Sequence, residues 1–318
     1  MKVAIGIDVG GTAIKGGLVS SKGAVLEKDT IPTQAERGVK HVIERTVSLI
    51  QALEKTESAD SVNAMALGVG VPGFIRRRQG LVVSSPNLEG WVDVPVVAML
   101  EKATNRQVIL DNDANNAALG EYVCGAGQGV RSMVMLTLGT GVGSGLILDG
   151  KLWRGANECG GELGHTIVQP DGRRCGCGQS GCLEAYASAE STARRTEELI
   201  RQGEASVLKG VLDRGEAITA KMVVDAARTE DALACRIWED TCRYLALACI
   251  NVQHTLNPEC IVFAGGMSTA GDFLREPVAR TVRKLHAERF GMPPEVRIAE
   301  LGSDAGFIGA ALSALRGE

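Results

Sequence analysis

Long apolar runs, a secretion signal and large basic blocks are all missing from this sequence of 318 residues. Nowhere do about 18 apolar residues follow one another without a charge, which disfavours a membrane-spanning helix. The first residues, MKVAIGIDVGGT, lack a charged segment ahead of an apolar one and a cleavage site. The net charge is −4 and the only prominent basic cluster is Arg76–Arg78, so nucleic acids and anionic membranes would be weakly attracted. We therefore expect a cytoplasmic protein with small-molecule partners.

The composition is that of an ordinary globular protein, with 45% hydrophobic and 23% charged residues. The length suffices for two domains. There are nine cysteines, an odd number, and three of them cluster at positions 175, 177 and 182. Without a secretion signal we expect the scattered cysteines to be reduced and buried. The scattered positions are 124, 159, 235, 242, 249 and 260.

Two segments of the chain repeat the same order of a strand, a glycine turn and a returning strand. The first runs through residues 3–19 and the second through residues 132–148, which indicates duplication of an α/β unit. We expect an N-terminal α/β domain of residues 1–115, joined by a last helix at about 303–318, and a C-terminal α/β domain of residues 116–302. Further strands are expected at 24–26, 65–71, 108–110, 260–264 and 296–299, and helices at 39–54, 96–104, 114–122, 185–202, 232–254 and 305–315.

The first glycine turn places Asp8 at the carboxyl end of a strand, ahead of Gly10, Gly11 and Thr12. Glycines let backbone N–H groups approach a phosphate closely, while Thr12 adds a donor and Lys15 a positive charge. Asp8 would face a Mg²⁺ ion or its water shell, since Mg²⁺ commonly uses one or two carboxylates besides substrate phosphates. A tight hairpin that merely requires glycine is the alternative, and this motif alone does not decide between them.

The second glycine turn, residues 139–145, contains Gly-x-Gly-x-Gly and could be taken for a dinucleotide-binding loop. That assignment requires a helix directly after the glycines, whereas a strand is expected here at 146–148. Two glycine turns on two α/β units instead fit a nucleoside triphosphate. A third turn at Gly265 and Gly266, after another apolar strand, could contact the adenine or ribose.

A histidine and three cysteines form the pattern His-x9-Cys-x-Cys-x4-Cys, with His165, Cys175, Cys177 and Cys182. Three thiolates and one imidazole are the ligand set of a structural zinc site. A disulfide would leave one cysteine over and is disfavoured in the cytosol, and a redox pair would have two intervening residues where this sequence has one.

A zinc ion there would fix Glu162 and Glu184 on either side of it. Two rigid carboxylates near a cleft suit a polyol, because each accepts hydrogen bonds from hydroxyl groups.

The segment Asp111-Asn112-Asp113 lies at the end of a strand and the start of a helix. Asp and Asn are preferred helix caps, and capping alone would explain them. Beside two phosphate loops, however, a carboxylate can orient and deprotonate an attacking hydroxyl. Asp113 is the candidate base, and Asn112 could hold a sugar hydroxyl. Asp111, in the same turn, is the competing candidate for the base.

These motifs together resemble the ROK family of sugar kinases and repressors, with the bacterial glucokinases closest. The resemblance extends from residue 3 almost to the C-terminus. It is carried by DVGGT (8–12), GVGVPG (68–73), PNLEGW (86–91), DNDAN (111–115), LGTGVGSG (138–145), GELGH (161–165) and CGCGQSGCLE (175–184).

The resemblance implies an α/β actin-like, ribonuclease-H-like ATPase fold with two domains around a cleft, and Asp113 as the catalytic base. Sugar contacts would come from Gly73, Asn87, Asn112, Asp113, Glu162, His165 and Glu184. His165 would also ligate zinc. Nucleotide contacts would come from Asp8, Gly10, Gly11, Thr12, Lys15, Thr140, Gly141, Gly265 and Gly266.

The activity implied is ATP-dependent phosphorylation of a hexose, foremost of glucose at its 6-hydroxyl, with Mg²⁺ accompanying the nucleotide. Kinases of N-acetylglucosamine, N-acetylmannosamine or fructose are alternatives, because Glu158 and Cys159 depart from the plainer segment of many members. A sugar-sensing repressor is disfavoured, since a strand expected at Val3 leaves no room for a preceding DNA-binding domain. By resemblance we also expect a homodimer or homotetramer.

Overall fold

The computed structural model describes residues 2–56 and 66–317 and consists of two compact units. Unit 1 comprises Met1–Val130, Gly145–Gly161 and Glu300–Glu318, and unit 2 comprises Arg131–Ser144 and Glu162–Ala299. The chain thus passes between the units four times. The domain boundaries expected from the sequence stay a prediction, because contacts define packing units and not independently folding domains.

Unit 1 is built on a mixed five-stranded sheet in the order β3-β2-β1-β4-β8. Its strands are β1 (Val3–Val9), β2 (Ala13–Ser20), β3 (Val25–Pro32), β4 (Ala66–Val71) and β8 (Val108–Asn112). Strand β1 pairs antiparallel with β2 and parallel with β4, which in turn is parallel to β8. The carboxyl ends of β1, β4 and β8 therefore meet at one edge of the sheet. Met65, expected at the start of β4, lies outside the described residues.

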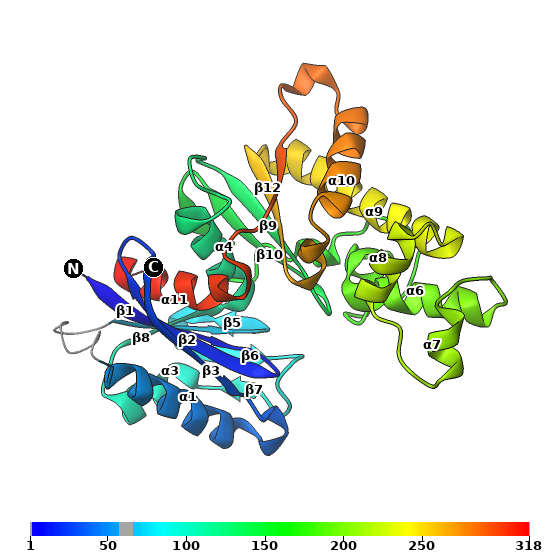
Figure 1. Ribbon diagram of the computed structural model, residues 1–318. Helices are drawn as coiled ribbons and strands as arrows, with labels where there is room; N and C mark the ends of the chain where they lie inside the picture. Colours follow the sequence, from blue (N-terminus) through cyan, green and yellow to red (C-terminus); the bar gives the residue numbers. More distant parts are fainter. Residues whose placement is uncertain (1, 57–65, 318) are drawn as a thin grey trace. The chain divides into compact units, whose positions relative to one another are not determined.

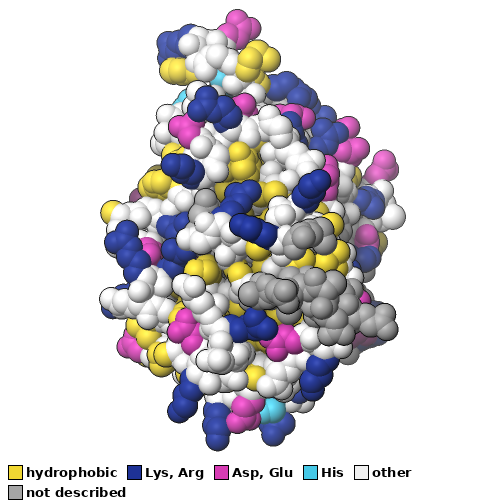
Figure 2. All heavy atoms as spheres, turned by 90° about the vertical axis from the view of Figure 1, so that its left-hand side faces the viewer, with side chains coloured by type: hydrophobic (Ala, Val, Ile, Leu, Met, Phe, Trp, Pro, Cys, Tyr) yellow, Lys and Arg dark blue, Asp and Glu magenta, His cyan; other side chains and the backbone are white. Residues whose placement is uncertain are grey.

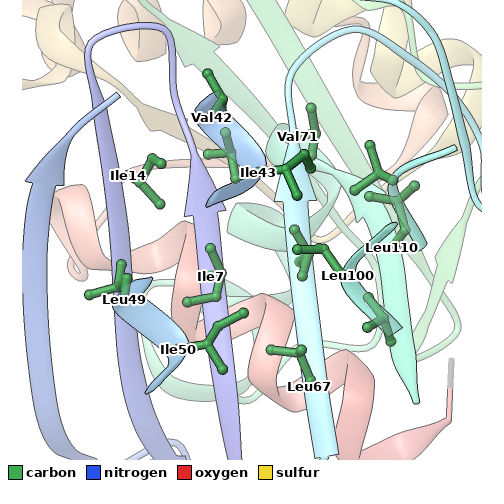
Figure 3. Close-up of a cluster of buried hydrophobic side chains, with 14 of the residues drawn as sticks. Ile7, Ile14, Val42, Ile43, Leu49, Ile50, Leu67, Val71, Leu100 and Leu110 are labelled. Carbon is green, nitrogen blue, oxygen red and sulfur yellow. The ribbon is translucent and has the colours of Figure 1, made fainter. Parts of the chain in front are cut away.

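One face of this sheet is covered by α1 (Val39–Glu54) and α3 (Val96–Thr104), and the other by α4 (Asp113–Cys124) and α11 (Ala305–Arg316) (Figure 1). Apolar side chains from the strands, α1 and α3 form a core in which Ile7 and Leu67 are fully buried. Burying one such side chain contributes about 1.5–3 kcal/mol. Figure 3 shows this core with Ile7, Ile14, Val42, Ile43, Leu49, Ile50, Leu67, Val71, Leu100 and Leu110 labelled.

Helix α11 lies against strands β1 and β4 with almost no side chain between the backbones. A Cβ atom added at Gly6 would lie 1.8 Å from the carbonyl oxygen of Phe307, and one at Gly68 would lie 1.8 Å from that of Ala310. Glycine is therefore required at these strand positions. The close approach ties the last helix of the chain to the first strand of unit 1.

The second large sheet has the order β11-β10-β9-β12-β13, and the unit boundary crosses it within β10. Strand β12 pairs parallel with both β9 and β13. The strands are β9 (Met133–Leu138), β10 (Val142–Leu148), β11 (Lys151–Trp153), β12 (Cys260–Ala264) and β13 (Glu295–Ile298). Strand β10 begins earlier than the expected residue 146, so half of the second glycine motif is strand.

The helices of unit 2 differ in several places from the sequence-based expectation. The helix expected at 185–202 is divided at Ser188, whose extended backbone and side-chain bond to the Ser191 N–H start a new helix. Three helices, Lys209–Asp213, Ala220–Arg228 and Asp272–Leu285, were not expected from the sequence, and the last of them contains Pro277 although proline usually interrupts helices. The helices are α5 (Glu184–Ala187), α6 (Ala189–Arg201), α7 (Lys209–Asp213), α8 (Ala220–Arg228), α9 (Ala232–Leu256) and α10 (Asp272–Leu285).

Unit 1 also contains a small sheet, and short 3₁₀ helices occur in both units. A small antiparallel sheet in unit 1 consists of β5 (Phe74–Arg76), β6 (Leu81–Ser84) and β7 (Val92–Val94). On the face shown in Figure 2, basic and acidic side chains are interspersed. Within residues 2–56 and 66–317, the helices are all too short or too polar to cross a bilayer. The short 3₁₀ helices are η1 (Ala35–Arg37), η2 (Arg77–Gln79), η3 (Leu163–His165), η4 (Gly266–Ala270), η5 (Glu288–Phe290) and η6 (Gly302–Asp304).

Candidate active site

The first glycine turn joins β1 and β2 in a tight hairpin. Gly10 closes it, with its N–H donating to the Ala13 carbonyl at 2.9 Å. A Cβ atom at Gly11 would lie 2.7 Å from the Asn87 carbonyl oxygen, so the turn is packed against the segment that carries Asn87. Thr12 is exposed at the tip. A predicted nucleotide turn and a predicted sugar residue are thus neighbours within unit 1.

Asp8 lies at the carboxyl edge of the unit 1 sheet, in register with Lys15 on β2. Gly306 leaves room for its carboxylate, because a Cβ atom there would lie 2.5 Å from Oδ2. The pKa of Asp8 is raised to about 7, chiefly by burial and also by the nearby Asp113, while Lys15 opposes both effects. A cation bound nearby would stabilise the ionised form of such a buried acid, which fits a carboxylate that faces Mg²⁺.

Asn112, rather than either aspartate, caps helix α4. Its Oδ1 accepts hydrogen bonds from the backbone N–H groups of Ala114 at 2.8 Å and Asn115 at 3.2 Å, and its Nδ2 donates to the Gly73 carbonyl at 3.1 Å. Asp113 is the first helical residue, and burial raises the pKa of its carboxyl group. The capping role is therefore met largely without Asp113.

Asp111 is held in a buried ion-pair network. Its Oδ2 lies 2.7 Å from the Arg154 guanidinium and 3.9 Å from that of Arg77, and its Oδ1 accepts from the Asn115 side chain at 3.0 Å. The side chain is only 3% exposed. The two guanidinium groups supply the counter-charges that a buried carboxylate requires. Asp111 therefore has a structural partner set that Asp113 lacks.

The second glycine turn joins β9 and β10 in unit 2, with the Gly139 N–H donating to the Gly141 carbonyl at 3.0 Å. A strand follows it, as expected, and not a helix. The Val142 N–H donates to Oε2 of Glu184 at 2.9 Å, and a Cβ atom at Gly141 would lie 2.4 Å from the same oxygen. The carboxylate of Glu184 thus lies directly against this turn, of which Thr140 is the exposed tip.

The third glycine turn, at Gly265 and Gly266, lies at the same end of unit 2 as the second. Its φ of 83° is strained for other residues, and a Cβ atom there would lie 2.7 Å from the Leu138 carbonyl oxygen. Gly266 begins the short helix η4 and is exposed. The turns at 139–141 and 265–266 therefore border one another.

The His165, Cys175, Cys177 and Cys182 side chains converge, with one ligand atom of each lying within 4.8 Å of all the others. The Cys175 sulfur lies 3.7 Å from Nδ1 of His165, and the sulfurs of Cys177 and Cys182 are 3.7 Å apart. A tetrahedral Zn²⁺ with Zn–S bonds of about 2.3 Å would place two thiolates about 3.8 Å apart. The donor set and its spacing therefore fit Zn²⁺.

The cysteine loop is also joined to the glycine turn. Glu184 accepts from the Cys175 thiol at 3.6 Å through Oε1, while its Oε2 holds Val142. Helix η3, which carries His165, packs on β10: a Cβ at Gly164 would lie 2.0 Å from the Val142 carbonyl oxygen. Burial raises the pKa of the Cys175 thiol to about 12, so a thiolate at this position requires a cation.

The model of the ROK family matches residues 4–316. The chain belongs to the ROK family. Its relatives include the glucokinases of Halalkalibacterium halodurans and Thermotoga maritima, each of which is 40% identical to it. Both alignments cover 96% of this chain, and they cover 92% and 95% of the two relatives, respectively. A ROK family glucokinase from Streptomyces griseus, in complex with glucose and AMPPNP, is similar in structure, with a TM-score of 0.82, 30% identity and 99% coverage of each chain.

The ROK family resemblance seen in the sequence is therefore confirmed, as is the α/β actin-like ATPase fold. Within this fold, unit 1 gathers one group of the predicted site residues and unit 2 gathers the other. Unit 1 holds Asp8, Gly10, Gly11, Thr12, Lys15, Gly73, Asn87, Asn112 and Asp113. Unit 2 holds Thr140, Gly141, Glu162, His165, Glu184, Gly265, Gly266 and the three clustered cysteines.

The sequence-based prediction missed residues that do not belong to the predicted sites but position the site residues. Gly306 makes room for Asp8, and Arg154 pairs with Asp111. A glycine inside the otherwise apolar segment of β4 indicates close packing, and an added Cβ atom at Gly70 would lie 2.8 Å from the Asn116 side chain. Arg154 and Asp111 are 43 positions apart in the sequence, so no local pattern predicts their ion pair.

Proposed function

We propose that this protein is a glucokinase, which transfers the γ-phosphoryl group of ATP to the 6-hydroxyl of glucose. Its glucokinase relatives match almost the whole chain. The structural observation that carries the proposal is the arrangement at the start of α4. Asn112 caps the helix, Asp111 is committed to Arg154, and Asp113 has a raised pKa suited to accept a proton.

In the proposed reaction, Asp113 accepts the proton of the sugar hydroxyl as the hydroxyl oxygen attacks the γ-phosphorus. The bond from the γ-phosphorus to the bridging oxygen breaks, and the products are ADP and glucose 6-phosphate. The amide of Asn112, already fixed by Gly73, supports the orientation of a sugar hydroxyl. Such positioning is the main contribution of a protein to phosphoryl transfer.

The nucleotide phosphates would be bound by backbone N–H groups of the two glycine turns, with Thr12, Lys15 and Thr140 adding polar contacts. Mg²⁺, when bound with ATP, neutralises charge that develops on the phosphates. Asp8 is the residue we assign to its side of the site. The high pKa of Asp8 supports this assignment, because the metal-free carboxylate has few stabilising charges.

A structural zinc would be held by His165 through Nδ1 and by the three clustered thiolates. Binding through Nδ1 leaves the other ring nitrogen of His165 for a sugar hydroxyl, as the family resemblance implies. The ion would also stabilise the loop from which Glu184 reaches the glycine turn. We assign further sugar contacts to Glu162 in unit 2 and to Gly73 and Asn87 in unit 1.

The proposal is tested by following ADP release from ATP with glucose, mannose, fructose, N-acetylglucosamine and N-acetylmannosamine as acceptors. We expect glucose to give the highest kcat/KM. Equal or higher kcat/KM with an N-acetylated sugar or fructose would overturn the glucose assignment. No turnover with any sugar would overturn the kinase assignment. Product position is checked with glucose 6-phosphate dehydrogenase, which reports only phosphorylation at the 6-hydroxyl.

We also propose a cytoplasmic location, since three ligating thiolates persist best in a reducing compartment. A homodimer or homotetramer stays a prediction, and light scattering of the purified protein would test it.

A further inference from the structure

Asn116, in helix α4, is a buried amide that the proposed reaction does not use. Its side chain is 1% exposed, and within residues 2–56 and 66–317 neither its Oδ1 nor its Nδ2 has a hydrogen-bond partner. An amide group offers two N–H donors and an acceptor oxygen. Burying these groups without partners is costly, so the groups that the amide faces indicate what the residue is for.

The position of this side chain is fixed by the packing of α4 against α11. A Cβ atom at Gly309 would lie 1.7 Å from the Asn116 carbonyl oxygen, and one at Gly120, a turn further along α4, would lie 2.5 Å from the Ala305 carbonyl oxygen. The two helices are therefore in backbone contact at two points. The Asn116 side chain points away from this contact, toward Gly70 in the sheet.

The amide lies where a side chain of residue 70 would be. Its Nδ2 is 2.8 Å from the position of a Cβ atom added at Gly70, and Asp8 Oδ1 is 3.7 Å and the Asp113 Cα 3.6 Å from the same position. Gly70 on β4 and Asp8 on β1 are partners in register, so their side-chain positions are neighbours on one face of the sheet. The Asn116 amide thus lies beside the Asp8 carboxylate.

The Asp8 carboxylate requires a donor that the protein does not supply directly. In the described parts of the chain it accepts no hydrogen bond from a protein group, and the Lys15 ammonium donates instead to the Ser303 carbonyl at 3.3 Å. An ionised carboxylate only accepts hydrogen bonds, whereas Nδ2 of Asn116 only donates them. The two groups share the space beside Gly70 without a direct bond. One water molecule can join them, because it accepts from one group and donates to the other.

We propose that Asn116 is a positioning residue for Asp8 and acts through one buried water, which accepts from Nδ2 and donates to Oδ1 of the carboxylate. The water stabilises the ionised carboxylate and fixes its orientation. Its importance in turnover rests on the proposed kinase function, in which Asp8 lies on the Mg²⁺ side of the site. Groups that orient a metal-side ligand typically change metal affinity about 10–100-fold when they are removed.

Nuclear magnetic resonance of the wild-type, substrate-free protein tests the water. We expect a cross-peak between a long-lived water and the side-chain amide protons of Asn116. The matched control is the adjacent Asn115, which is also buried but whose Nδ2 donates to Asp111 Oδ1 at 3.0 Å. Its amide protons should show no such cross-peak. Absence of the cross-peak at Asn116, or equal cross-peaks at both residues, would overturn the proposal.

Binding of Mn²⁺ in the presence of AMPPNP, followed by electron paramagnetic resonance, tests the action on Asp8. Asn116→Leu keeps the approximate shape but removes the donor, so we expect the affinity for Mn²⁺ to fall about tenfold. In the control Asn115→Leu, Asp111 loses a donor, so the midpoint of thermal unfolding should fall while the affinity for Mn²⁺ changes less than about twofold. Unchanged affinity in Asn116→Leu, or equal losses in both variants, would refute the action on Asp8.

Kinetics separate this role from a purely structural one. We expect Asn116→Leu to raise the KM for Mg²⁺–ATP about tenfold while kcat at saturating Mg²⁺ stays within about twofold. A fall in kcat with unchanged KM would contradict the proposed action. If Asn116→Leu does not fold, the wild-type resonance experiment still decides whether the water is bound. Absence of kinase activity in the wild type would refute the proposed function but would leave the result of that experiment unaffected.

Discussion

The two glycine hairpins of this protein have the same topology but are held in place differently. The β1–β2 hairpin is fixed by backbone contacts, with Gly11 against the carbonyl of Asn87, and it carries its own acid, Asp8. The β9–β10 hairpin takes its acid from elsewhere, since Glu184 on α5 binds the Val142 N–H. Because Glu184 also contacts Cys175, the second hairpin depends on the cysteine loop and the first does not.

The largest effect is expected at the acids beside the first hairpin. Asp113→Asn removes the proposed base and should lower kcat by about 10²–10⁴-fold while glucose binding is retained. Asp111→Asn is the contrasting change, because it leaves Arg154 buried without its partner charge and should lower stability by about 3–5 kcal/mol. Rate assays, calorimetric glucose titration and thermal unfolding separate the two. Near-normal turnover of Asp113→Asn would contradict the base assignment.

The next largest effect is expected when the cysteine loop, on which the second hairpin depends, is disrupted. Cys182→Ser should lower the zinc content from about one ion per chain to near zero, since a closed site needs all four ligands. Hydrogen exchange should then rise in residues 139–145 and stay unchanged in the β1–β2 hairpin. Cys235→Ser, outside the cluster, is the control. Equal loosening of both hairpins would show that the proposed difference between them does not exist.

Local patterns in the sequence were sufficient for most strands of the two large sheets, the glycine turns and the convergence of the Cys–His side chains, because spacing and residue type carry that information, but they did not predict β11 or the small sheet β5-β6-β7. They could not rank Asp113 above Asp111, whose distinction rests on Arg154. Nor could they reveal that Glu121 accepts from the Leu301 N–H or that Glu184 accepts from the Val142 N–H, because these donors lie far away in the sequence. Such contacts exist only once the sheets have formed. The assignment of individual sugar, nucleotide and zinc ligands stays a prediction.

A pH experiment sharpens the comparison by isolating the acid of the first hairpin. The pKa of Asp8 is about 7 in the folded protein against 3.8 as an unperturbed value, so the folded state binds the proton more tightly. Wild-type stability should therefore fall as pH rises through the window from about 4 to about 7, without Mg²⁺. Asp8→Asn lacks this titration, so its stability advantage should be larger at about pH 8 than at about pH 5. An advantage independent of pH in thermal unfolding would contradict the assignment.

The smallest effect is a difference in unfolding free energy that tests whether each hairpin packs against a side chain or against backbone. The Cβ of Gly141→Ala meets Oε2 of Glu184 at 2.4 Å, whereas that of Gly11→Ala meets the Asn87 carbonyl at 2.7 Å. Removing the Glu184 side chain should therefore relieve Gly141→Ala by about 0.5–3 kcal/mol, measured by urea unfolding of both single variants and the double variant. Asn87→Ala leaves its carbonyl in place.

The matched cycle of Gly11→Ala with Asn87→Ala should accordingly be additive to within about 0.5 kcal/mol. Coupling in this cycle as large as in the first would mean that the β1–β2 hairpin also rests on a side chain. The second hairpin would then no longer be distinguished by its borrowed acid. Coupling confined to Gly141 and Glu184 means that this acid directly limits the space at the turn, and is therefore the means by which the cysteine loop acts on it.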